Sequence, residues 1–189
     1  MDRHSFTRRG FMVAGGAAAT SALAACNNGI NSSGGAVIDQ RVDATESFLF
    51  NTYPQTRDLA AKAAGILYMP LITKAGFGVG GSYGRGALRI NGSTVDYYSA
   101  ATATFGVQFG VQQYAHALFF MTEPALRSFR TSAGWTLGAD AEYAVKDFGG
   151  NLSADIMTAT SPVIALVFGQ AGLIIGATLA GTKYTRIIP

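Results

Sequence analysis

The sequence predicts an α+β domain: N-terminal helices packed on a curved antiparallel β-sheet that could close toward a barrel. Three observations lead to this fold class. Apolar residues recur with helical spacing between residues 37 and 64. From Gly76 onward the apolar and polar residues instead alternate with a period of two, as in strands. The pair Asn91-Gly92 lies between two such runs and is typical of a tight β-hairpin turn.

Residues 1–25 are expected to be a signal peptide that is removed. A basic stretch from Arg3 to Arg9 precedes an apolar run from Phe11 to Ala25, which is too short and too rich in Ala and Gly for a stable membrane span. The segment TRRGFM, residues 7–12, resembles the twin-arginine export signal. The alternative is an ordinary basic region of a secretory signal.

Cys26 is expected to be the site of lipid attachment. It is the single cysteine of the chain, and the segment LAAC that it ends resembles the bacterial lipobox, in which the cysteine is acylated, for example with palmitate. Several acyl chains hold a protein on a bilayer because each buried CH₂ contributes about 0.8 kcal/mol. Asn27 follows, which by resemblance to enterobacterial sorting rules favours the outer membrane, facing the periplasm. The alternative is a stray or buried thiol.

Loss of the signal changes the charge balance. The chain has 14 Lys and Arg and 11 Asp and Glu, and residues 1–25 take away three basic residues and one acidic residue. The remaining chain is nearly neutral, so bulk charge gives no argument for nucleic acid as a partner. We expect a lipidated flexible tether over residues 26–36, rich in Gly, Ser and Asn, followed by a single domain over residues 37–189.

Two helices are predicted at the start of the domain, over residues 37–50 and 56–64, with Pro54 between them. In the first helix, apolar side chains are expected on one side and charged side chains on the other. The apolar set is Val37, Val42 and Phe48-Leu49-Phe50, and the charged set is Asp39, Arg41 and Asp43.

The stretch GFGVGGSYGRGAL, residues 76–88, is expected to form one long strand or a strand bent midway. Because alternate side chains of a strand point to opposite faces, the small residues would line one face. A face without side chains lets another backbone segment come very close. The small residues of this face are Gly76, Gly78, Gly80, Ser82, Gly84 and Gly86.

Two catalytic or cofactor motifs overlap this stretch. Gly76-x-Gly78-x-x-Gly81 matches a dinucleotide fingerprint, but that motif must open a helix, and the residues that follow are strand-like. The segment around Ser82 matches the nucleophile elbow of a hydrolase, which needs a histidine base and a strand–turn–helix context. His116 is the only histidine after the signal, and a lone histidine in an apolar run is usually structural. We therefore expect no enzyme and no cofactor, with a Ser82 hydrolase as a less favoured alternative.

Strand-like alternation continues over residues 104–121 and 134–145, with a short helix between them. Thr122 is a good N-cap for that helix and Pro124 fits its first turn. Its apolar residues, Leu126 and Phe129, should face inward, and Arg127 and Arg130 should face outward. Asp140 and Glu142 could be paired carboxylates for acid–base chemistry or Ca²⁺, but a solvated strand face without metal is favoured.

The uncharged segment from Pro162 to Gly181 is long enough to span a bilayer as a helix. Turn-forming residues from Gly169 to Gly172 interrupt it, however, and each flank is rich in β-branched residues. Two buried strands joined by a tight turn are therefore favoured over a transmembrane helix.

Three ordered blocks, residues 60–88, 105–126 and 167–187, resemble those of the SYLF domain family, and the resemblance covers about residues 40–188. The resemblance implies a lipid-binding module and not an enzyme; the family occurs in eukaryotic endocytic and actin-patch proteins and in bacterial lipoproteins. Two family features are replaced: a turn lysine stands as Ala171, and a Trp and a Pro are missing around residues 97–100. The phosphoinositide and actin ligands of eukaryotic members do not transfer to a periplasmic protein.

Five cations in the matching blocks are candidates for binding lipid headgroups, if they converge: Lys74, Arg85, Arg89, Lys183 and Arg186. Together they could meet the phosphates of anionic lipid or lipopolysaccharide. The alternative is five dispersed surface charges. The expected function is that of a lipid-anchored module which binds lipid or another component of the cell envelope. A scaffolding lipoprotein that binds a protein partner is the main alternative.

Overall fold

The structure is a computed structural model that describes residues 32–77, 79–105, 110–140, 143–146, 161–169 and 179–189. Expectations for the signal peptide, Cys26, Ala171 and the strand after Gly172 lie outside these residues. The elements are α2 (Gly34–Thr52), α3 (Thr56–Lys62), β1 (Gly65–Phe77), β2 (Val79–Ile90), β3 (Ser93–Phe105), β4 (Gly110–Phe120), α4 (Glu123–Thr131), β5 (Trp135–Thr136), β6 (Tyr143–Lys146), β7 (Val163–Phe168) and β8 (Lys183–Ile187).

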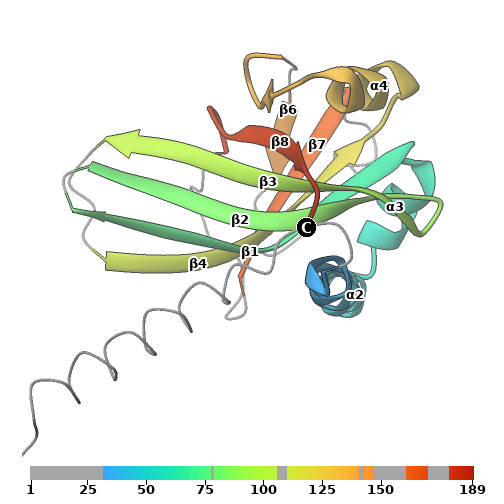
Figure 1. The fold of residues 1–189 in the computed structure, drawn as a ribbon. Coiled ribbons are helices and arrows are strands. Elements are labelled where there is room, and N and C mark those ends of the chain that lie inside the picture. Colours follow the sequence, from blue (N-terminus) through green and yellow to red (C-terminus); the bar gives the residue numbers. More distant parts are fainter. Residues whose placement is uncertain (1–31, 78, 106–109, 141–142, 147–160, 170–178) are drawn as a thin grey trace, which may run out of the picture.

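The strands form one eight-stranded sheet with the order β5-β8-β3-β2-β1-β4-β7-β6. Its pairs are antiparallel except β6 with β7, which is parallel. The sheet is strongly curved, and the long strands β1 to β4 extend beyond the helices (Figure 1). The predicted α+β class with a curved sheet is confirmed, and the parallel pair is an addition that the sequence did not indicate.

The helices cover opposite faces of the sheet. Met69 of β1 packs in one cluster with Phe129 of α4. The neighbouring Tyr68 packs in a second cluster with Val42 of α2. We call these the α4 face and the α2 face. Because successive strand residues alternate between the faces, the strand position decides which helix a side chain can reach.

A β-bulge in β1 reverses this alternation. The register with both neighbouring strands shifts between Tyr68 and Ile72, and Pro70 lies within the shift. Proline has no N–H to donate to a ladder, so a bulge is one of the few places in a sheet that accepts it. As a result Met69 and Ile72, which differ in parity, both belong to the α4 face.

The glycine-rich stretch is a hairpin and not one long strand. β1 ends at Phe77, β2 begins at Val79, and Gly76 pairs with Gly80. The expectation of a single strand was therefore wrong. Directly opposite residues of an antiparallel pair share a face, so Gly76 and Gly80 still lie on the face that their parity predicted.

Two glycines of this face are required by the bulge opposite them. A Cβ atom on Gly84 would lie 2.4 Å from the carbonyl oxygen of Leu71 and 2.4 Å from Cδ1 of Ile72. A Cβ atom on Gly86 would lie 2.0 Å from the carbonyl oxygen of Tyr68. All three distances are far below contact distance, so the predicted close approach of another backbone segment is confirmed at these positions. The segment that approaches is the neighbouring strand.

α2 begins at Gly34, inside the stretch expected to be tether. Its N-terminus meets the end of the chain, because Ser32 Oγ donates to the carbonyl oxygen of Pro189 at 2.8 Å. Ile38 is buried, whereas Val37 is 42% exposed. The buried face of α2 therefore begins at Ile38 and not at Val37 as predicted.

α4 matches the prediction closely. The side chain of Thr122 accepts a hydrogen bond from Ala125 N, Leu126 and Phe129 are buried, and Arg127 and Arg130 are exposed. A β-hairpin turn is also confirmed where β2 meets β3.

The predicted strand over residues 134–145 is present only at its two ends, as β5 and β6, so the prediction of one continuous strand was wrong. β5 stops at Thr136, because Gly138 takes a positive φ of 86° and Asp140 Oδ2 accepts a hydrogen bond from Thr136 N at 2.6 Å. Asp140 thus closes a turn. Glu142 lies outside the described residues.

The strand predicted first in the uncharged segment is present as β7, and every one of its residues is buried. Within the part of the chain that the structure describes, no helix has the length and apolar character needed to cross a membrane.

Candidate functional site

Ser82 and His116 are held in separate structural contacts. Ser82 is buried and hydrogen-bonded to Tyr114. His116 is fully buried, and its Nε2 lies 2.8 Å from the hydroxyl of Tyr184. Burial lowers the pKa of His116 to about 3, so the ring stays neutral at physiological pH. The prediction of a structural histidine is confirmed. Among the described residues there is also no group of three or more side chains suited to a metal ion.

The five candidate cations do not form one cluster. Arg85 and Arg89 share the parity of Ala87 and so lie on the α2 face, whereas the bulge places Lys74 on the α4 face with Ile72. At the other edge of the sheet, Arg186 follows the α4-face parity of Tyr184, and Lys183 has the opposite parity.

Arg89 is engaged by α2. Its guanidinium forms ion pairs with Asp43 and with Glu46, the latter at 2.6 Å. Glu46 also accepts a hydrogen bond from the hydroxyl of Tyr68 at 2.9 Å. Burial alone would lower the pKa of Arg89, but the two carboxylates outweigh it and raise that pKa. Arg89 is thus committed to fixing α2 on the sheet.

Asp39 extends this contact between α2 and the sheet. It accepts hydrogen bonds from Thr94 Oγ1 at 2.8 Å and from the hydroxyl of Tyr97 at 2.7 Å. Burial, and then the bond to Asp39, raises the pKa of Tyr97 to about 12. Asp39 was expected to face solvent, so its role in docking the helix is a correction.

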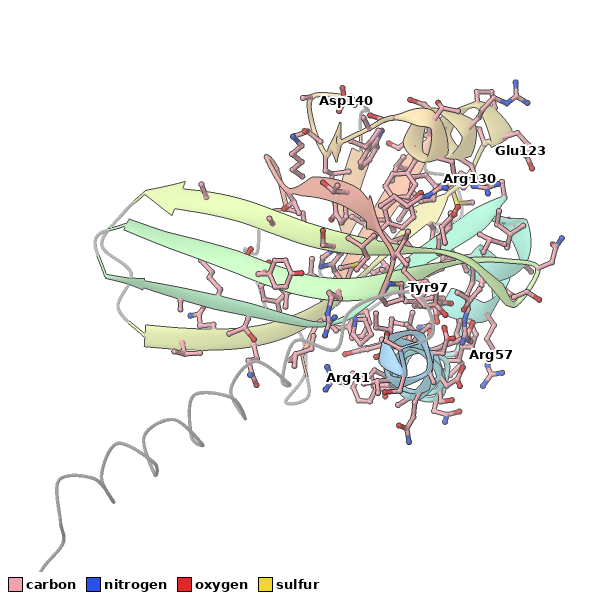
Figure 2. All side chains as sticks on the ribbon, in the orientation of Figure 1. Arg41, Arg57, Tyr97, Glu123, Arg130 and Asp140 are labelled. Atoms are coloured by element: carbon pink, nitrogen blue, oxygen red, sulfur yellow. The ribbon has the colours of Figure 1, made fainter. Side chains whose placement is uncertain are left out.

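Arg186 lines a groove together with two other arginines. The groove has a volume of about 390 Å³ and lies between α4 and the ends of β2 and β8. We call it the arginine groove. Figure 2 shows Arg130 and Glu123 on the α4 side of the molecule, with Arg41 and Arg57 on the side of α2 and α3. The lining residues are Ile90, Glu123, Leu126, Arg127, Arg130, Thr131 and Arg186.

Asp96 holds two of these arginines. Arg130 Nε lies 3.0 Å from Asp96 Oδ2, and Arg186 Nη1 lies 3.5 Å from Asp96 Oδ1. The carboxylate side chain is only 11% exposed, whereas those of Arg130 and Arg186 are 41% and 62% exposed. The carboxylate therefore fixes two guanidinium groups from below and leaves them open to solvent.

The sequence predicts only that Arg127 and Arg130 face outward. Their spacing of three on one helix places them side by side, which is the signal that could have suggested a cationic surface. Their meeting with Arg186 depends on the packing of α4 over β8 and could not be read from spacing.

The family model Ysc84, described as Las17-binding protein actin regulator, matches residues 101–186. This match over residues 101–186 is consistent with a SYLF-domain protein. The resemblance found in the sequence is thereby confirmed. No curated protein matches the chain. The matched segment includes all three arginines of the groove, Arg127, Arg130 and Arg186, whereas Lys74, Arg85 and Arg89 lie outside it.

Proposed function

We propose that this chain is a non-catalytic lipoprotein of the bacterial cell envelope whose SYLF domain binds anionic lipid headgroups. The observation that supports this most is the meeting of Arg127, Arg130 and Arg186 in one solvent-open groove within the matched segment. Guanidinium groups pair with phosphate through two parallel hydrogen bonds, so clustered arginines favour phosphate-bearing partners. Membranes present such phosphates at high density.

The proposed lipid anchor at Cys26 would hold the arginine groove near the membrane. Cys26 lies six residues before Ser32, and a chain of that length spans at most about 20 Å. Ser32 is bonded to Pro189, only three residues beyond Arg186. An acyl chain on Cys26 would therefore keep the end of the sheet that carries Arg186 near the bilayer.

The remaining parts of the proposal come from the sequence. They are twin-arginine export through residues 7–12, acylation of Cys26, and residence in the outer membrane facing the periplasm. The phosphates of phospholipid or of lipopolysaccharide are the proposed partners there.

Co-sedimentation with vesicles tests lipid binding without the anchor. The chain from residue 26 onward, with Cys26→Ser and without the expected signal peptide, is mixed with phosphatidylglycerol or phosphatidylcholine vesicles at low and high salt. We expect binding to phosphatidylglycerol that weakens at high salt, because exposed charges are screened. Equal binding to both lipids, or binding to neither, would contradict the proposal.

A scaffolding lipoprotein is the second candidate. The long strands beyond the helices expose large side chains, with Tyr83 56% exposed and Val111 69% exposed. Exposed apolar surface of this kind can serve contacts with another protein or a second copy. Sedimentation velocity of the Cys26→Ser chain over a range of concentrations separates the candidates. A stable oligomer that ignores anionic vesicles would favour the scaffold.

A further inference from the structure

We infer that the arginine groove is a phosphate-binding site, with the phosphate of a phospholipid headgroup as its occupant. The inference rests on the proposed function and assigns it to Arg127, Arg130 and Arg186. Arg89 is not part of this site, because it forms ion pairs with Asp43 and Glu46 of α2.

Asp96 orients the guanidinium groups of Arg130 and Arg186 and pairs with only one nitrogen of each. A guanidinium has five N–H donors, and the ion pairs with Asp96 occupy Nε of Arg130 and Nη1 of Arg186. The two Nη atoms of Arg130 and the other nitrogens of Arg186 form no ion pair within the described ranges, so they remain for a ligand. Two guanidinium groups fixed by one carboxylate of low exposure form a prearranged pair of forks for phosphate oxygens.

Arg127 adds a charge that is not held in an ion pair with any described residue. It forms no ion pair or hydrogen bond through its side chain among the described residues, and it lies one helical turn from Arg130. The groove wall has one carboxylate, Glu123, against three arginines, and Asp96 lies beneath them. An anion between the arginines would relieve their mutual repulsion.

Tyr98 is not one of the residues that line the groove, but it lies beside Arg186 and carries a buried polar group without a described partner. It is the register partner of Arg186 and shares its face. The side chain is 2% exposed, yet its hydroxyl has no hydrogen-bond partner among the described residues. Burial, and then the charge of Asp96, raises the pKa of Tyr98 to about 12, against the opposing effect of Arg186 and Arg130. The hydroxyl is thus a neutral donor within the field of the groove's charged groups.

The size and position of the groove indicate a headgroup. A volume of about 390 Å³ exceeds what a single small ion needs and falls within the range of small-molecule sites. The groove also lies at the end of β8, close to the point from which the chain leads back to Cys26. A lipid phosphate is therefore within reach of an anchored domain.

The test compares Arg127→Glu with Arg41→Glu in the Cys26→Ser chain. Arg41 is an exposed arginine of α2 on the opposite face, so both variants change the net charge equally. Two probes are used. Binding to phosphatidylglycerol vesicles is measured by co-sedimentation, and binding of glycerol 3-phosphate in solution is measured by calorimetry. Arg127→Glu should weaken vesicle binding about tenfold or more, because a charge-assisted contact is lost and repulsion is added. Arg41→Glu should change it less than about twofold.

The outcomes separate the site from the function. If both variants reduce vesicle binding equally, the groove is not the site, while lipid binding stands. If vesicles are not bound but glycerol 3-phosphate is, and Arg127→Glu removes that binding, the groove takes free phosphate compounds and the lipid function falls. If neither probe binds the parent chain, the inference is overturned. Circular dichroism of each variant checks that its fold is retained.

Discussion

The carbonyl oxygen of Tyr68 occupies the place that a side chain on Gly86 would need, 2.0 Å from the position of its Cβ atom. The bulge around Pro70 brings that carbonyl over β2, and Ile72 and Leu71 approach Gly84 in the same way. The glycines are therefore explained by contact within the sheet, and neither a cofactor nor a nucleophile is needed to account for them.

Gly86→Ala should destabilise the domain by about 3 kcal/mol or more, because the obstacle is backbone that cannot rotate away. Gly81→Ala is the matched control on the same strand, since its Cβ would meet the carbonyl oxygen of Thr102 at 3.2 Å and needs only a small adjustment. Urea denaturation measures both. Equal stability of Gly86→Ala and the parent chain would show that the close approach is not present in solution.

His116 should make the domain sensitive to acid. Its pKa is about 3 in the folded state and near 6.5 when unfolded, so below pH 6.5 the unfolded chain binds a proton that the folded chain does not. Stability is then constant above that pH and falls by about 2 kcal/mol between pH 7 and pH 5. His116→Gln should lack this part of the pH dependence. Identical pH profiles for the two proteins in urea denaturation would contradict the buried neutral histidine.

Arg89→Met should lower stability and leave lipid binding intact. The substitution removes the partner of Glu46, whose carboxylate is 25% exposed, and we expect a loss of about 1–3 kcal/mol. Asp43 is largely exposed and should contribute little. Affinity for phosphatidylglycerol vesicles should stay within about twofold of the parent chain. A large loss of vesicle affinity with unchanged folding stability would instead show that Arg89 binds the lipid headgroup, as expected from the sequence.

Tyr98→Phe should separate binding from stability. Removing a buried hydroxyl that has no partner in the described part of the chain should leave the unliganded domain equally stable or up to about 1 kcal/mol more stable. Tyr184→Phe is the control, because it leaves Nε2 of His116 unpaired and should cost about 1–3 kcal/mol. Vesicle affinity should fall in Tyr98→Phe. Unchanged affinity would remove Tyr98 from the proposed site.

The sequence predicted those elements whose signals are local. The N-cap at Thr122 and the two-residue turn at Asn91-Gly92 each depend on a few neighbouring residues, and both are present as expected. The face shared by Gly76 and Gly80 was also foreseen, because parity is kept across the hairpin.

The failures of the prediction have non-local causes. The bulge at Pro70 is visible only when β1 is paired with its neighbours, and it moves Lys74 away from the face of Arg85. The carboxylates that engage Arg89 come from another element. The arginine groove likewise joins α4 to β8, which are far apart in the chain. Alternation and spacing contain no information on such contacts.

Chemical footprinting of arginines on vesicles tests the central claim most directly. The Cys26→Ser chain is treated with phenylglyoxal, which modifies accessible guanidinium groups, with and without phosphatidylglycerol vesicles, and the modified peptides are quantified by mass spectrometry. We predict that vesicles protect Arg127 and Arg186 strongly and leave Arg41 as reactive as in free protein. Equal reactivity of Arg127 and Arg41 on vesicle-bound protein would contradict the assignment of the arginine groove to lipid phosphate.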